Sequence, residues 1–314
     1  MRCRQLPISV FSLLLHFSTQ MDYQSTLRNL QPHHDFFIGI DSDGCVFDTM
    51  EVKQKEFFIP NAIKFFNLYE VSEELRETWE FVNLYSIFRG GNRFNSIVKV
   101  FELLEKRKKI IDQNIKLPEL SSLKAWLKKE TKLSNDNLLT YFESNYDANL
   151  EKVVKWTEAV NTDITTRLRS IPPFRHARLA VEQLSTVADI VIVSQTPLEA
   201  LEREWSEHGM KKYVNLIAGQ EHGTKTEHLA LAAKAKYSPN KILMIGDAKG
   251  DLEAAKNNNI LFYPIIPGKE DESWKNFIKE GLERFINGNF EGAYGEELLV
   301  KFRSTLPESP SWQD

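Results

Sequence analysis

The pattern of apolar and polar positions distinguishes stretches typical of buried strands from a long stretch typical of helices. Residues 36–40 form a short apolar run that ends at acidic and glycine residues, which is typical of a buried strand. From about residue 51 to 170, apolar residues recur at spacings of three and four, which indicates helices. The clearest such stripe runs through residues 139–168 with one interruption at Thr157, and we interpret it as a packing face.

Beyond Pro172 and Pro173, helical and strand patterns alternate. The expected helices lie near 175–185, 198–207, 224–235 and 250–257, and the expected strands near 189–193, 214–218, 241–245 and 260–263. Such alternation is typical of a parallel sheet with right-handed crossovers and helices on both faces.

The predicted fold is therefore α/β, with a Rossmann-like parallel sheet and a large all-helical cap domain inserted after the first strand. We assign residues 34–50 and 171–303 to the core and residues 51–170 to the cap. Residues 304–314, which contain two prolines, are expected to be a frayed tail.

Residues 1–33 are expected to be a leader, disordered or added by an upstream start site. Arg2 and Arg4 precede an apolar stretch that is too short to span a bilayer. No small-x-small cleavage site follows it, so a targeting segment at 1–20 is the alternative to an extension.

Composition narrows the class of protein. The 314 residues carry 44 acidic and 40 basic side chains, and this near-neutral balance argues against a dedicated nucleic-acid binder. The two cysteines, Cys3 and Cys45, have no metal-binding spacing, which argues against a disulfide scaffold and a structural zinc site. We expect a cytoplasmic protein that binds no membrane, and the sequence does not indicate its oligomeric state.

Polar side chains gather where the predicted strands end. Ligands of open α/β sheets bind outside the carboxyl ends of the strands. The segments at those ends and at the following helix starts are Asp41-Ser42-Asp43-Gly44, Ser194-Gln195-Thr196-Pro197, Lys225 within a Thr224/Glu227 capping box, and Gly246-Asp247 with Asp251 four residues later. Each alone is typical of a turn or a helix cap, but their shared placement indicates one site.

This combination resembles the haloacid dehalogenase superfamily. Its four motifs correspond here to Asp41-x-Asp43-Gly44, Ser194, Lys225 and Gly246-Asp247-x-x-x-Asp251. The continuation to Asp48-Thr49 looks like the branch that contains phosphoglycolate phosphatase and β-phosphoglucomutase. The resemblance covers about residues 36–50 and 185–265. Gln195 departs from that branch, which more often has Asn there.

The resemblance implies a role for each motif residue. Asp41 would be the nucleophile and Asp43 the general acid and base, since residues i and i+2 of an extended strand end share a side. Mg²⁺ would be held by Asp41, the Asp43 carbonyl, Asp247 and Asp251. Ser194 and Lys225 would bind the transferring phosphoryl group. Gly44 and Gln195 would contact the substrate.

The helical insert would close over this site as a cap. Its most unusual segment surrounds Gly90-Gly91, where Arg89 and Arg93 could clamp an anionic substrate. The alternative is an interhelical loop with solvated arginines.

Three functions remain open. The first is a Mg²⁺-dependent phosphatase acting on a small phosphorylated metabolite, and the second a β-phosphoglucomutase-like phosphomutase. The third is a non-catalytic protein that binds partners through the insert. Asp43 argues against dehalogenase and phosphonatase activity, because those enzymes lack an acid/base aspartate at this position.

Overall fold

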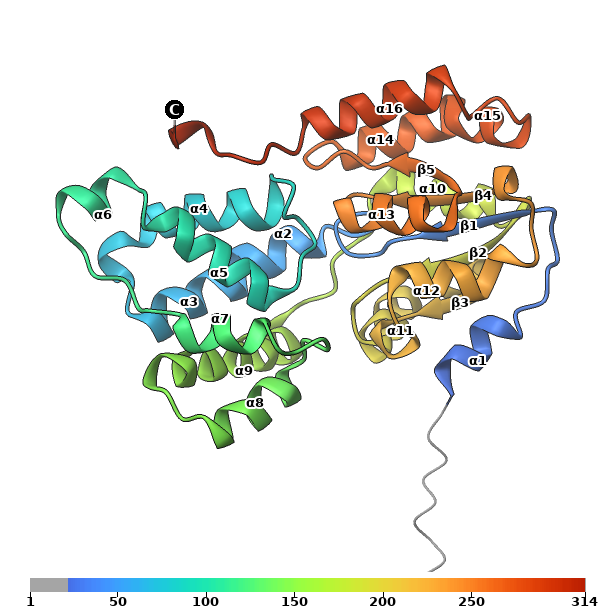
Figure 1. Cartoon of the computed structure of the whole chain (residues 1–314). Helices are drawn as coiled ribbons and strands as arrows, with labels where there is room; N and C mark the ends of the chain where they lie inside the picture. Colours follow the sequence, from blue (N-terminus) through green and yellow to red (C-terminus); the bar gives the residue numbers. More distant parts are fainter. Residues whose placement is uncertain (1–21, 314) are drawn as a thin grey trace, which may run out of the picture.

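Five parallel strands form a sheet in the order β3-β2-β1-β4-β5 (Figure 1). The strands are β1 (Phe36–Ile40), β2 (Ala188–Val193), β3 (Leu216–Ala218), β4 (Ile242–Gly246) and β5 (Leu261–Pro264). The structure, a computed structural model, describes residues 22–313. In the central strand, Ile40 pairs with Ile192 on one side and Ile245 on the other. The parallel sheet expected from the sequence is confirmed.

Helices cover both faces of the sheet because each strand alternates its buried side chains between them. Ile38 and Ile40 face one layer and Phe37 faces the other. The first layer is α10 (Arg175–Leu184), α11 (Leu198–Glu207), α14 (Glu270–Asn276) and α15 (Leu282–Ile286). The second layer is α1 (Tyr23–Arg28), α12 (Lys225–Leu229), α13 (Lys249–Asn258) and α16 (Ala293–Ser304).

A helical cap is inserted between β1 and α10. Its helices are α2 (Thr49–Lys53), α3 (Ile59–Phe66), α4 (Ser72–Leu84), α5 (Arg93–Leu104), α6 (Lys108–Asp112), α7 (Ser121–Leu127), α8 (Asn135–Ser144) and α9 (Ala148–Arg167). Its interior is aromatic, with the Trp79 and Trp156 rings 5.7 Å apart in a T-shaped arrangement. The two chain connections to the core lie side by side, since Phe174 N donates to Val46 O at 2.9 Å.

Shorter helical turns link or extend these elements. The π-helical turns are Gln54–Phe58, Ala230–Lys234 and Phe277–Gly281, and the 3-10 turns are Tyr69–Val71, Lys211–Tyr213, Gln220–His222, Pro239–Lys241 and Ser311–Gln313.

The apolar stripe at residues 139–168 crosses two helices, α8 and α9. The prediction of a single packing face there was therefore wrong. The Asp147 side chain accepts a hydrogen bond from Leu150 N at 2.8 Å and begins α9 as its N-cap. Tyr146, in the break between α8 and α9, is 72% exposed. The helical spacing continued through this break by coincidence.

The two ends of the described chain are folded, unlike the expectation for residues 22–33 and 304–313. In α1, Leu27 is fully buried against the sheet. The C-terminal strap, residues 305–313, leaves α16 and reaches the cap (Figure 1). There, Pro307 O accepts from Ile87 N at 3.2 Å, and the Trp312 ring lies 5.4 Å from Phe81. The rest of the predicted leader, residues 1–21, with the alternative targeting segment at 1–20, lies outside the described residues.

Within residues 22–313, no helix is both long and apolar enough to cross a lipid bilayer. The cytoplasmic location stays a prediction.

Candidate active site

Three buried aspartates converge at the carboxyl ends of the adjacent strands β1 and β4. Asp41 directly follows β1, Asp247 directly follows β4, and Asp251 lies in the first turn of α13. One carboxylate oxygen from each lies within 4.8 Å of the others. The structure thus assembles residues that are 210 positions apart in the sequence, as the predicted topology requires.

The backbone explains why the carboxylates can approach so closely. Asp41 N donates to Ile245 O at 3.0 Å, which continues the β1–β4 ladder into the site. A Cβ at Gly246 would lie 2.3 Å from Asp251 Cγ, so only glycine leaves room for that side chain. Asp251 Oδ2 in turn accepts from Ala248 N at 3.0 Å, which fixes the start of α13.

Lys225 bridges two of these carboxylates. Its Nζ lies 2.8 Å from Asp41 Oδ2 and 2.6 Å from Asp251 Oδ1. The predicted capping box is present, because Thr224 Oγ1 accepts from Glu227 N and the Glu227 carboxylate accepts from Thr224 N. Burial alone would lower the pKa of Lys225, but Asp251 and Asp41 outweigh it and raise the pKa, so the side chain stays charged.

The crowded carboxylates resist ionisation. Burial raises the pKa of Asp41 to about 6, with Lys225 opposing the rise and Asp251 adding to it. Burial likewise raises the pKa of Asp247 to about 6, with Arg89 opposing. A nearby cation would relieve both effects.

The donor set fits a hard divalent cation. It offers carboxylate oxygens, which Mg²⁺ and Ca²⁺ prefer. Asp247 Oδ1 is buried and has no hydrogen-bond partner among residues 22–313, so one oxygen of the cluster is available as a ligand.

Asp43 lies apart from this cluster and is held by residues of both domains. Lys53 Nζ lies 2.8 and 2.7 Å from its two oxygens, and Thr196 Oγ1 donates to Oδ2 at 2.6 Å. Thr49 Oγ1 also donates to Oδ1. Burial would raise the pKa of Asp43, but Lys53 and the two hydroxyl groups lower it overall. The carboxyl group is therefore ionised at neutral pH in this arrangement.

Ser194 and Gln195 order the loop after β2. Ser194 N donates to Ala218 O at 3.0 Å, and its Oγ accepts from Thr196 N at 3.2 Å. Gln195 Nε2 donates to Gly223 O at 2.9 Å, which joins this loop to the turn before Lys225. Ser194 is buried and Gln195 is exposed.

Arg89 reaches from the cap into the carboxylate cluster. Its Nε lies 2.6 Å from Asp247 Oδ2, and the two side chains are 1% and 0% exposed. Gly44 faces the same guanidinium group: its φ is +78°, and a Cβ there would lie 2.5 Å from Arg89 Nη2. Both constraints require glycine at this position.

Arg93 does not join Arg89, so the predicted clamp of two arginines is not formed. Arg93 Nη1 donates to Thr157 Oγ1 and Asn161 Oδ1, both at 2.8 Å, and its guanidinium lies 4.9 Å from the Phe58 ring centre. All three partners belong to the cap. Burial lowers the pKa of Arg93 to about 10. As the first residue of α5, Arg93 turns into the cap interior.

Three further residues around the site were not predicted as site residues. Lys53 and Thr196 bind Asp43, and Glu204 on α11 accepts a hydrogen bond from Ser42 Oγ at 3.4 Å. Burial, with the charge of Asp43, raises the pKa of Glu204 to about 8. The only local signal was Thr196 within Ser-Gln-Thr-Pro, which equally suits a helix start.

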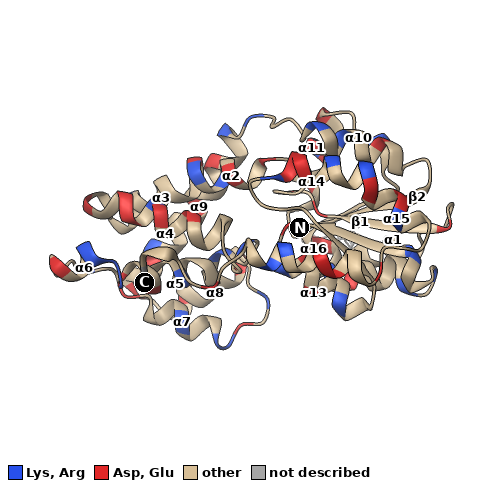
Figure 2. Ribbon diagram, turned by 90° about the horizontal axis from the view of Figure 1, so that it is seen from above, with Lys and Arg blue, Asp and Glu red and all other residues tan. Residues whose placement is uncertain are grey.

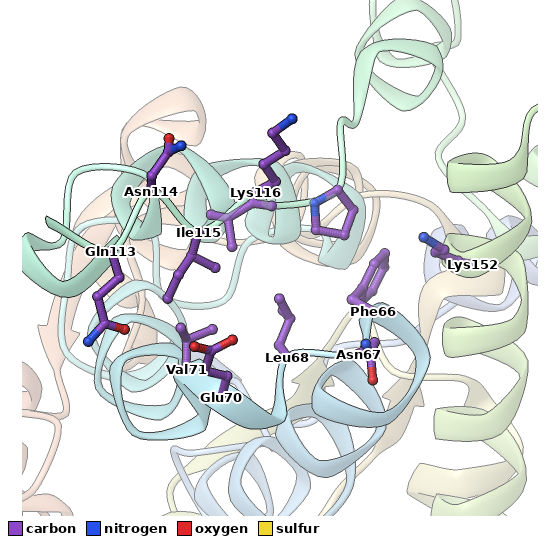
Figure 3. A pocket seen from close by; sticks show the side chains of 12 residues that line it. Phe66, Asn67, Leu68, Glu70, Val71, Gln113, Asn114, Ile115, Lys116 and Lys152 are labelled. Atoms are coloured by element: carbon purple, nitrogen blue, oxygen red, sulfur yellow. The ribbon is translucent and has the colours of Figure 1, made fainter. Parts of the chain in front are cut away.

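Two pockets lie outside the carboxylate cluster. The larger, about 550 Å³, belongs to the cap and is lined by Phe66, Lys152 and residues 113–118 among others (Figure 3). None of the predicted site residues lines it. The second, which we call the seam pocket, has about 250 Å³ and lies between residues 87–91 of the cap and the start of α13. Its charged lining residues are Arg89, Lys99, Lys249 and Glu253, and Lys249 Nζ lies 3.4 Å from Glu253 Oε1.

Charged residues of both signs are spread over the helices of both domains (Figure 2). The seam pocket brings cations of the two domains together, since Lys99 belongs to α5 and Lys249 to α13.

Comparison with known proteins matches the chain to one protein family. A family model described as haloacid dehalogenase-like hydrolase matches residues 92–265, slightly more than half of the chain. The match begins after the segment that contains Asp41 and Asp43. Comparison with curated protein sequences gave no match.

Several solved structures are similar in part. A putative phosphoglycolate phosphatase from Lactobacillus delbrueckii subsp. bulgaricus has 13% sequence identity and a TM-score of 0.45, over 73% of this chain and 85% of that one. A predicted phosphoglycolate phosphatase from Haemophilus somnus has 15% identity and a TM-score of 0.44, over 77% and 96%. A predicted phosphatase from Clostridium acetobutylicum has 12% identity and a TM-score of 0.43, over 80% and 99%.

Proposed function

Because this chain belongs to the haloacid dehalogenase-like hydrolase family, we propose that it is a Mg²⁺-dependent phosphatase acting on a small phosphorylated metabolite through an aspartyl-phosphate intermediate. The observation that carries this proposal is the contact of Asp41 with Lys225 at 2.8 Å, beside two further buried carboxylates. Phosphoryl transfer needs such an anionic nucleophile with nearby cations that neutralise the transferring group.

Asp41 is the nucleophile of this reaction. Its Oδ1 accepts from Ser42 N at 2.8 Å, and its Oδ2 contacts Lys225. A carboxylate oxygen of Asp41 bonds to phosphorus while the ester P–O bond breaks, and the leaving oxygen takes a proton from Asp43. Water then attacks phosphorus and gives its proton to Asp43, the acyl-phosphate P–O bond breaks, and inorganic phosphate leaves.

The contacts of Asp43 favour the second half of this reaction. Lys53 and Thr196 stabilise its ionised form, which is the form that accepts a proton from water. The first half requires protonated Asp43, so its contact with Lys53 must break before Asp43 acts as an acid. Lys53 belongs to α2 of the cap, so a cap movement could control that contact.

Asp41, Asp247, Asp251 and the Asp43 carbonyl would hold Mg²⁺. The unpaired Asp247 Oδ1 supports this assignment. When bound, Mg²⁺ would neutralise negative charge on the phosphoryl oxygens. Ser194 and Lys225 would bind the same phosphoryl group from the β2 and α12 side of the site.

The substrate would extend from this site toward the seam pocket. Three cations and one carboxylate line that pocket, and the resulting net positive charge suits an anionic group remote from the reacting phosphate. The four residues are Arg89, Lys99, Lys249 and Glu253. Gly44 and Gln195, which follow β1 and β2, would contact the substrate near the reacting phosphate.

A panel of phosphorylated sugars, nucleotides and short acids, assayed with Mg²⁺, tests the function. We expect phosphate release without an isomerised sugar phosphate, which distinguishes a phosphatase from a phosphomutase. If no phosphate ester is turned over, including a generic aromatic one, a non-catalytic binding protein is the better interpretation.

Two matched variants test the roles of the first motif. Asp41→Asn should abolish turnover, because an amide cannot form the acyl phosphate. Asp43→Asn should be slower by about 10²–10⁴-fold and should retain a longer-lived phosphoenzyme, because water lacks its base. Rapid-quench trapping of labelled phosphate on the protein measures this. Label on Asp41→Asn would mean that the two roles are wrongly assigned.

The metal is tested by Asp247→Asn and by chelation. An amide oxygen lacks the charge that a hard cation prefers, so this variant should lose most of its activity and bind Mg²⁺ more weakly. Full activity in excess chelator would refute the metal requirement.

A further inference from the structure

Arg89 joins the cap to the carboxylate cluster of the core through one charged contact. Its Nε lies 2.6 Å from Asp247 Oδ2, although 158 residues separate the two in sequence. Both side chains are almost fully buried. A buried ion pair costs desolvation on both sides, so this contact is weak evidence for a large contribution to stability.

The guanidinium group is held in this position by the backbone of both domains. Arg89 Nη1 donates to Leu84 O at 3.0 Å within the cap, and Nη2 donates to Gly44 O at 3.5 Å in the core. The absence of a side chain at Gly44 makes room for Nη2. Arg89 is thus seated at the edge of the proposed metal site.

The charge balance places Arg89 in competition with a divalent cation. Three carboxylates face two cations, Lys225 and Arg89, which leaves one net negative charge. Asp247 Oδ2 accepts a hydrogen bond from Arg89, and Asp247 Oδ1 has no hydrogen-bond partner within the described part of the chain. A divalent cation on Asp247 would draw on the carboxylate that holds Arg89 and would repel the guanidinium group across it.

We propose that Arg89 is a latch: it and a divalent cation compete for Asp247, so that cation binding loosens the cap and cap closure weakens cation binding. The inference rests on the metal site of the proposed function. The coupling is reciprocal, since each partner changes the affinity of the other by the same factor.

Once released from Asp247, the Arg89 side chain can occupy a second position in the seam pocket. Arg89 also lines the seam pocket, together with Lys99, Lys249 and Glu253. A guanidinium freed from Asp247 can turn into this pocket and meet an anionic part of the substrate. The latch would therefore make Arg89 available for substrate only after the cation has bound.

Calorimetric titration of Mg²⁺ into the full chain tests the competition. Arg89→Met should bind Mg²⁺ more tightly than the unaltered protein, by about 5-fold or more, the lower end of typical coupling. Arg89→Lys keeps the charge and should bind less tightly than Arg89→Met. Arg76→Met removes an exposed cation of the cap helix α4 and should leave the affinity unchanged. Unchanged or weaker binding by Arg89→Met would overturn the latch, and weaker binding would make Arg89 a positioning residue for Asp247.

Hydrogen exchange on the unaltered protein is a second test of the latch, with Arg89→Met as its control. Added Mg²⁺ should increase amide exchange in residues 85–92, because it releases Arg89, and should not do so in Arg89→Met. No Mg²⁺-dependent change in the unaltered protein would overturn the latch. If that protein binds no Mg²⁺ at all, the metal site of the proposed function fails as well, whereas metal binding with unchanged exchange rejects the latch alone.

Discussion

Thr196 Oγ1 donates a hydrogen bond to Asp43 Oδ2 at 2.6 Å, although the two residues are 153 positions apart. The contact joins the loop after β2 to the segment after β1. Lys53 approaches the same carboxylate from the cap. The proposed acid/base residue is therefore held by Thr196 of the core and by two residues of the cap helix α2, Thr49 and Lys53.

Thr196→Val should raise the pKa of Asp43, because the hydroxyl stabilises the ionised carboxylate. A hydrogen bond to a charged group contributes about 1.5–3 kcal/mol. The acid limb of the kcat–pH profile should move to higher pH if Asp43 must accept a proton from water. Thr49→Val, which removes the other hydroxyl on this carboxylate, should shift it in the same direction. An acid limb that stays in place in both variants would contradict a base role for Asp43.

Arg89→Ala should change the enzyme's preference between substrates, whereas Arg93→Ala should change its thermal stability. Arg89→Ala should lower kcat/KM for the natural substrate more than for a small aromatic ester, because it removes a remote contact. Arg93→Ala should instead lower the melting temperature and affect both esters equally, since its partners Thr157 and Asn161 lie within the cap. The comparison needs steady-state kinetics and thermal denaturation of both variants. A selective loss in Arg93→Ala would restore the two-arginine clamp.

Asp189 provides a prediction about acid stability away from the site. Its buried carboxylate accepts hydrogen bonds from His33 N, His34 N, Tyr237 Oη and Asn215 Nδ2. Burial would raise the pKa of Asp189, but these bonds lower it overall. A lowered folded-state pKa gives stability that is present above the unfolded value of about 3.9 and is lost as pH falls through the folded value.

Asp189→Asn should therefore lower the free energy of unfolding at pH 7 by about 1.5–3 kcal/mol and flatten its decline below about pH 4. Chemical denaturation at several pH values measures both effects. Asp35→Asn is the control, because the Asp35 side chain is 83% exposed. Equal pH profiles for Asp189→Asn and the unaltered protein would show that this carboxylate contributes no pH-dependent stability.

Trp312→Ala should detach the C-terminal strap. The Trp312 ring lies 5.4 Å from Phe81 and 4.5 Å from the Arg107 guanidinium, which are aromatic and cation–π distances. Limited proteolysis should then cut residues 305–313 sooner. Glu308→Gln, an exposed change in the same segment, should leave the cleavage rate unaltered. Equal cleavage of Trp312→Ala and the unaltered protein would mean that other contacts hold the strap.

Local patterns predicted the elements that share a sheet edge. Asp41 and Asp247 could be placed together because the carboxyl ends of adjacent parallel strands meet, and the Thr224/Glu227 box located the start of α12. The contact of Lys53 with Asp43 could not be foreseen, because it depends on how the cap is set against the core. The same is true of Trp312, whose neighbouring prolines suggested a frayed end.

The strap attaches the cap to the core in addition to the two chain connections and the contacts of Arg89 and Lys53. Pro307 holds Ile87 only two residues before Arg89. Any hinge rotation of the cap must break this hydrogen bond or carry the end of the chain along. A purification tag or fluorophore fused to the C-terminus would therefore be placed beside the moving domain, where it could report on the rotation or obstruct it.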